Sequence, residues 1–163
     1  MRLLAVLAAA FGLTSSGWHT FRAHGISVRY PARWHATAQR LTLVTYPPQI
    51  VAVASYPLPR GNGGADGCSP KQALDRLQPA GAFIFGWEFT QPGSRRKRDF
   101  PPRPKHFRLT HFARYECGGP SYLLRFRQAG RYFQIHIALG RRASKATRAT
   151  VLRIVDSFHA KPR

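Results

Sequence analysis

Alternating apolar and polar residues run along much of this chain and predict β-strands. In the segment 26–30, the apolar residues Ile26, Val28 and Tyr30 alternate with polar ones, as expected for a strand that buries one face. Other segments with strand character are 18–25, 41–46, 82–89, 106–117, 121–127 and 131–139. Residues 49–58 are apolar on both faces, so we expect them to form a central strand.

The same alternation assigns two histidines to opposite environments. His111 falls on the apolar register of the strand predicted at 106–117, which indicates a core histidine. His136 falls on the register opposite the core residue Phe133, where solvent or a helix would meet it.

Two segments have the pattern of amphipathic helices. The first begins with Ser69 as N-cap and Pro70 at the first helical position. Its apolar stripe is Ala73, Leu74 and Leu77. The second follows the N-cap Ser144. Its apolar residues are Val151, Leu152, Val155 and Phe158.

The order of these elements predicts the fold class. Strands, a helix, more strands and a closing helix indicate an α+β domain, with a mostly antiparallel central sheet flanked by helices. Residues 128–130 form a three-residue hairpin loop in this scheme, with Gly130 in the left-handed position. A chain of 163 residues suits a single domain with one core.

The N-terminus has the layout of a secretory signal peptide. Arg2 precedes an apolar run from Leu3 to Leu13, and small polar residues follow. We therefore expect residues 1–17 to direct export, with cleavage near Ser16 or Gly17. The apolar run is shorter than the roughly 20 residues that span a bilayer. The alternative is a buried N-terminal helix of a cytosolic protein.

The chain has two cysteines, Cys68 and Cys117, and they are not in a CxxC motif. In an exported protein an even number of cysteines favours a disulfide. We expect a bridge between them, and the alternative is two unrelated buried thiols.

Charge is the strongest compositional feature. The formal net charge is +20, from 26 Lys and Arg against 6 Asp and Glu. Such an excess predicts attraction to polyanions. GC-rich codons, which favour Arg, Ala, Gly and Pro, would explain the same composition without a selected function.

One proline-rich loop concentrates this charge. It spans residues 93–107, and its basic residues are Arg95, Arg96, Lys97, Arg98, Arg103 and Lys105. We expect a stiffened basic loop that contacts an anionic cell-envelope polymer or an anionic lipid surface, with plain solvation as the alternative. A second basic surface would form if a sheet face stayed uncovered at Arg108, Arg114, Arg125 and Arg127.

Catalytic and metal-binding patterns are weak. Glu88 and Glu116 would make a glycosidase pair if they met, but pairing of each with an arginine is the simpler interpretation. The sequence has no GxSxG motif, no cysteine in a catalytic context and no HExxH motif. We therefore expect no catalytic residues, metal or cofactor.

Three short motifs resemble PsbP-like proteins: GISVRYPARWHA near residue 30, an FPPRP segment before a strand, and the closing VLRIVDSF. The likeness covers residues 18–159 and leaves 160–163 as a loose tail. More specifically, the chain resembles uncharacterised exported actinobacterial members of this family. The likeness implies a PsbP-like α/β/α sandwich and a non-enzymatic exported module.

The sequence therefore favours a monomeric, exported binding or structural module of the cell envelope with a basic surface. One alternative is an extracytoplasmic hydrolase with a site assembled from scattered residues, among them Glu88, Glu116 and His111. Another is a basic nucleic-acid-binding protein, which requires the signal-peptide interpretation to be wrong. Otherwise nucleic acid is not an expected partner, and no specific small molecule is indicated.

Overall fold

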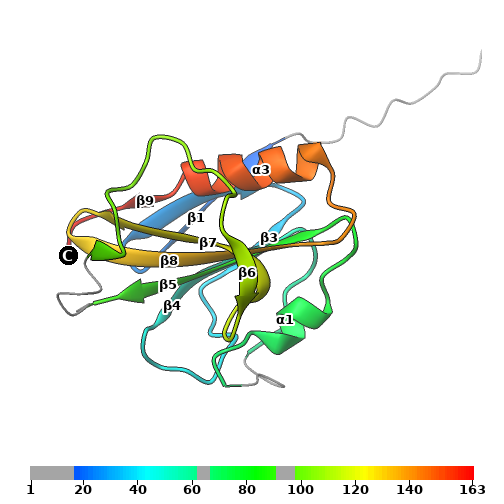
Figure 1. Cartoon of the computed structure of the whole chain (residues 1–163), viewed down its shortest axis with the longest axis horizontal. Coiled ribbons are helices and arrows are strands. Elements are labelled where there is room, and N and C mark those ends of the chain that lie inside the picture. The colour runs from blue at the N-terminus through cyan, green and yellow to red at the C-terminus, as the bar shows by residue number, and fades with distance from the viewer. Residues whose placement is uncertain (1–16, 62–66, 91–97) are drawn as a thin grey trace, which may run out of the picture.

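A computed structural model describes residues 17–61, 67–90 and 98–163 of the chain. The strands are β1 (Trp18–Ala23), β2 (Ile26–Pro31), β3 (His35–Thr37), β4 (Gln49–Ala54), β5 (Ala82–Phe89), β6 (Phe112–Tyr115), β7 (Gly119–Gln128), β8 (Arg131–Leu139) and β9 (His159–Ala160). The helices are α1 (Lys71–Asp75) and α3 (Lys145–Asp156). Figure 1 shows their arrangement.

The strands form two sheets, and all paired strands are antiparallel. One sheet has the order β1-β2-β9, and the other has the order β3-β4-β5-β8-β7-β6. The predicted α+β class with mostly antiparallel strands is therefore confirmed. The expectation of one central sheet is wrong, because β1 and β2 pair with the short strand β9 near the C-terminus instead of joining the larger sheet.

The larger core lies between the two sheets. Side chains of α3 and of β2 pack on one face of the six-stranded sheet, and the rings of Phe126, Phe133 and Phe158 contact one another at its centre. In Figure 1, α3 lies with β1 and β9 on one side of the six-stranded sheet. The predicted Ser144 cap is present, since its Oγ accepts a hydrogen bond from the Thr147 N–H.

A second core covers the opposite face of the six-stranded sheet. Alternate residues of β5, namely Phe83, Phe85 and Trp87, pack there with Ala73 of α1. Both faces of β5 are therefore buried, which explains its nearly continuous apolar sequence. Ser69 does not cap α1, because no side chain bonds to the N-terminus of this short helix.

Four predicted strands are shorter or absent, and two of these, those at 18–25 and 49–58, only end early, at Ala23 and Ala54. Residues 41–46 are not a strand. The Gln49 side chain accepts from the Leu41 N–H and donates to the Gln39 carbonyl, so it replaces the backbone hydrogen bonds that a neighbouring strand would make there. Of the segment 106–117, only β6 is a strand. The preceding proline segment bonds to Arg127, farther along β7.

The β7–β8 turn and the C-terminal residues also differ from expectation. Gln128 pairs with Arg131, so the β7–β8 turn has two residues rather than three. Ala129 and Gly130 both have positive φ, at 53° and 74°, as a type I′ turn requires. The C-terminal residues are not a loose tail, because Ala160 is buried in β9 and the Lys161 N–H bonds to the Gly25 carbonyl.

A buried ion pair connects the two sheets. Arg131 donates to both carboxylate oxygens of Glu88, at 2.8 and 2.7 Å, and both side chains are almost fully buried. Its remaining donors bind the carbonyls of His24, Gly25 and Lys161. Burial alone would raise the pKa of Glu88, but the hydrogen bonds and charges of Arg131 and Arg163 outweigh it and hold the pKa below 4.5.

We expect Glu88→Gln to lower the free energy of unfolding by about 3–5 kcal/mol, because it leaves the Arg131 guanidinium buried without a counter-charge. Urea denaturation at neutral pH measures this loss. Asp75→Asn is the matched control, since Asp75 pairs with Lys71 on the exposed surface, and its expected cost is below about 1 kcal/mol. Equal stability of the two variants would contradict the assigned role of the buried pair.

Candidate functional site

The structure describes only part of the predicted basic loop. Arg95, Arg96 and Lys97 lie outside the described residues, while Arg98 and Lys105 are exposed. Arg103 is partly buried and makes internal contacts. Its guanidinium donates to the carbonyl oxygens of Asp156 and Pro104, and it lies 5.4 Å from the Phe107 ring centre. Arg103 therefore anchors the segment and is not a free surface charge.

The segment from Phe100 to Phe107 is attached to the protein body at several points. The Phe107 N–H and the His106 ring both bond to the Asp156 carboxylate at the end of α3. Phe100 packs on the rings of Phe89 and Tyr132. Residues 99–107 lie outside regular helices and strands, as predicted, whereas Arg98 is helical. Tertiary contacts fix the position of the segment from Phe100 to Phe107.

Between this segment and β7 lies a surface groove, which we call the proline groove. It consists of two adjoining pockets of about 450 Å³ each. Both are lined by Pro101, His111, Leu123 and Arg125. The remaining lining residues are Asp99, Pro102, Pro104, His106, Phe107, Arg108, Thr110, Tyr115 and Leu124. The groove therefore combines an apolar lining with cationic and imidazole side chains.

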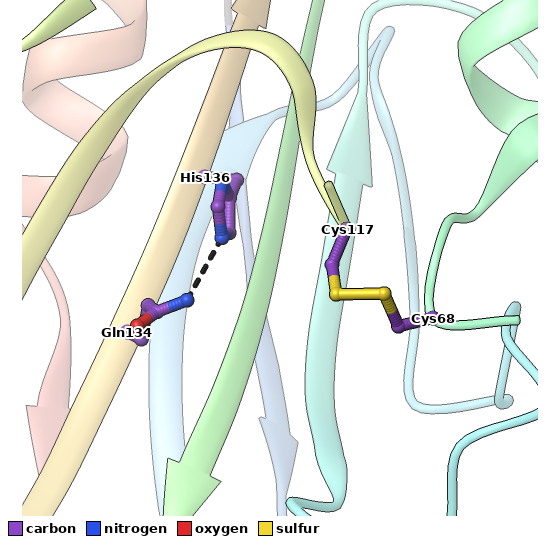
Figure 2. The surroundings of a disulfide bond; sticks show 4 residues. All are labelled: Cys68, Cys117, Gln134 and His136. Carbon is purple, nitrogen blue, oxygen red and sulfur yellow. Dashed lines mark hydrogen bonds between the residues drawn. A yellow bond between two sulfur atoms is a disulfide. The ribbon is translucent and has the colours of Figure 1, made fainter. Parts of the chain in front are cut away.

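A chain of hydrogen bonds leads from the groove into the protein. Arg125 Nε donates to Gln134 Oε1 at 3.0 Å, so the Gln134 amide nitrogen faces His136 Nε2, also at 3.0 Å. That nitrogen must accept the Gln134 N–H, which leaves the imidazole proton on Nδ1. Nδ1 then donates to Ser121 Oγ at 3.1 Å. Figure 2 shows Gln134 and His136 of this chain beside the disulfide.

His136 is buried, which corrects the sequence expectation for both histidines. The residue is 3% exposed, and its ring meets the rings of Trp87 and Tyr115 edge to face, whereas His111 is exposed at the groove. Burial, and secondarily the charge of Arg125, lowers the pKa of His136 to about 4. His136 is therefore neutral at physiological pH.

Ser121 and His136 do not form a nucleophile and a base. A general base must accept the serine proton, but the His136 nitrogen that faces Ser121 carries a proton itself. Ser121 is also fully buried, so a substrate has no access to its hydroxyl. The pair instead supports the orientation of Gln134 and Arg125.

The predicted disulfide between Cys68 and Cys117 is present. It joins the chain just before α1 to the turn between β6 and β7, next to His136 (Figure 2). Gly118 follows Cys117 and lies against the His136 ring so closely that any side chain there would overlap Nδ1. The disulfide and Gly118 together hold this turn over the buried histidine.

The two glutamates of the hydrolase alternative are not brought together. Glu88 pairs with Arg131 and Arg163, which confirms the simpler interpretation for this residue. Glu116 is exposed in the turn before β7. Glu88 is level with Phe133 and Phe126, whereas Glu116 follows Tyr115, which is level with Gly119. The seven-residue step from Phe126 to Gly119, at about 3.3 Å per residue, separates the two glutamates by more than about 20 Å. Within the described ranges, no group of His, Cys, Asp and Glu could hold a metal ion.

Comparison with known proteins gives no relative, since neither the known protein families nor the curated proteins contain a match to this chain. None of the helices among the described residues is long and apolar enough to cross a membrane. Any candidate site therefore rests on geometry. The proline groove and the hydrogen-bond chain behind Arg125 are its best-defined parts, and sequence reasoning did not identify either.

We expect the buried His136 to make the protein less stable in mild acid. The unfolded chain takes up a proton near the ordinary pKa of 6.5, whereas folded His136 does so only near pH 4. The free energy of unfolding should therefore fall between these pH values, by up to about 3 kcal/mol at 1.36 kcal/mol per pH unit. Urea denaturation at a series of pH values measures this slope.

His136→Gln should flatten this slope, whatever its effect on stability at neutral pH. The exposed His111 provides the control, and His111→Gln should keep the wild-type slope. If His136→Gln and the wild type show the same pH dependence, His136 is not buried in its neutral form.

Proposed function

We propose that this protein is an exported, non-enzymatic binding module of the cell envelope that holds an anionic polymer on its basic surface. The observation that carries the proposal is the uncompensated surface charge. Within residues 17–61, 67–90 and 98–163, twenty Lys and Arg side chains are exposed, against three exposed carboxylates, those of Asp75, Asp99 and Glu116.

Most of this exposed charge is not used in ion pairs within the protein. Among the exposed basic side chains of the described ranges, only Lys71 and Arg163 pair with a carboxylate. If the stability of the fold required these surface charges, we would expect them to have partners of opposite sign. A surface with so few pairs repels itself and attracts polyanions over about a Debye length.

Export is supported by two independent features. The N-terminal residues have the composition of a signal peptide. The Cys68–Cys117 disulfide is of the kind that persists in oxidising compartments. The antiparallel sheet, with α1 and α3 on opposite sides, is in keeping with the PsbP-like sandwich that the motifs suggest, and we include that family in the proposal.

An anionic polymer fits the described surface better than a lipid bilayer. A groove is concave and accepts a strand, whereas a bilayer meets protruding apolar side chains and cations. The exposed large apolar side chains of the described ranges are Leu43, Tyr46 and Phe112, and none of them lines the proline groove. We therefore place the binding surface at the groove and its cationic surroundings.

The purified protein should be retained on a heparin column at low salt and released as the salt concentration rises. Salt weakens the attraction, because the Debye length falls from about 10 Å at 0.1 M salt to about 3 Å at 1 M. A neutral dextran column is the control and should retain nothing. If the protein passes through the heparin column at low salt without being retained, the proposed function is refuted.

Two further ligands separate the proposal from its alternatives. Vesicles of phosphatidylglycerol and duplex DNA are tested at the same salt concentration as a teichoic-acid type polymer. Preferred binding of the polymer supports the proposal. Preference for vesicles would move the assignment to a lipid surface, and preference for DNA would favour the nucleic-acid-binding alternative.

A further inference from the structure

We propose that the proline groove is the binding site for a single strand of acidic polysaccharide, with Arg108 and Arg125 as the contacts to its acidic groups. The inference rests on the proposed function, because it names the ligand class and the residues of that same activity. It narrows a general electrostatic attraction to one place on the surface.

The shape of the groove suits an extended ligand. Two pockets of about 450 Å³ adjoin along β7 and share the residues Pro101, His111, Leu123 and Arg125. Such a site accepts consecutive units of a chain, whereas a single compact pocket would accept one small molecule. The groove runs between the anchored proline segment and the outer face of β7, so both of its walls are parts of the folded domain.

The chemistry of the lining suits sugar rings that carry carboxylates. Proline rings, Leu123 and the Tyr115 ring offer apolar surface, against which the C–H faces of a sugar can pack. Arg108 and Arg125 offer charge-assisted donors to an acidic group. Single-stranded nucleic acid requires exposed aromatic rings for its bases. In the groove's lining Phe107 is buried and Tyr115 is half-buried, so the smaller imidazole rings of His106 and His111 are its exposed rings. This offers bases less stacking surface than a nucleic-acid site requires.

Arg125 is held in place before any ligand arrives. Its Nε donates to Gln134, and Gln134 is fixed by the buried His136, which bonds to the buried Ser121. An arginine that only increased solubility would not need a buried polar chain behind it. Because the guanidinium is already oriented, binding costs less conformational entropy.

The opposite wall is equally fixed. Phe107 and His106 bond to the Asp156 carboxylate, and the Arg103 N–H bonds to the Arg127 carbonyl. The groove therefore exists in the free protein and does not have to form around the ligand.

Asp99 provides a test of whether the ligand in the groove carries negative charge. This exposed carboxylate lines the pocket that also contains Tyr115, and it would repel an acidic group bound there. We infer that the acidic groups of the ligand lie toward Arg108 and Arg125. Removing the Asp99 charge should strengthen binding, a result that damage to the fold cannot produce.

The experiment measures the affinity of fluorescently labelled oligogalacturonate, a carboxylated sugar chain, by anisotropy at low ionic strength. Arg108→Gln with Arg125→Gln should weaken binding about tenfold, since two charge-assisted contacts are lost. The matched control, Arg141→Gln with Arg142→Gln, removes the same charge from exposed residues that do not line the groove, and should weaken binding by no more than about twofold. Asp99→Asn should tighten binding by about twofold.

Each outcome has a separate meaning. If the wild type binds neither oligogalacturonate nor a glycerol-phosphate polymer, the proposed function fails. If it binds, but the groove pair and the control pair lose the same affinity, the groove assignment is overturned while the polyanion-binding function stands. Weaker binding by Asp99→Asn also overturns the assignment. Equal groove-dependent affinity for the glycerol-phosphate polymer, which has no sugar rings, would contradict the polysaccharide class.

Discussion

The packing of the two sheets depends on the contacts of one buried group, the guanidinium of Arg131. It neutralises Glu88 on the neighbouring strand β5 and so keeps that carboxylate from being a buried unpaired charge. Its other donors satisfy carbonyls in the β1–β2 turn and after β9. These partners belong to both sheets, and each would be costly to leave unpaired. One side chain therefore fixes how the small sheet lies on the large one.

Strand β8 connects this structural constraint to the proline groove, the proposed binding site. Its odd-numbered residues from Phe133 to Ile137 face the core between the sheets, while Gln134 and His136 face the opposite side. Gln134 and His136 in turn orient Arg125 on the next strand. Strand β8 thus carries both the Arg131 ion pair and the Gln134–His136 hydrogen bonds. The pairing of β5, β8 and β7 sets the position of Arg125 in the groove.

The sequence predicted what depends on local patterns and missed what depends on long-range packing. The Ser144 cap and the α+β class follow from short-range spacing, and the disulfide from counting cysteines. Alternation correctly assigned His136 to the face opposite Phe133, but neither solvent nor a helix meets it there, because the disulfide-bound turn and the rings of Trp87 and Tyr115 cover it. The proline groove was not predictable, because it forms only when the loop bonds to Asp156 and Arg127, both distant in sequence.

Hydrogen exchange in the presence of an acidic polysaccharide tests the central claim most directly. The account predicts that bound oligogalacturonate slows exchange in peptides covering 98–111 and 121–127, which form the groove. Peptides covering 141–153, which are equally basic but lie elsewhere, should be unchanged. Protection spread evenly over all the basic surfaces, or concentrated on 141–153, would contradict it.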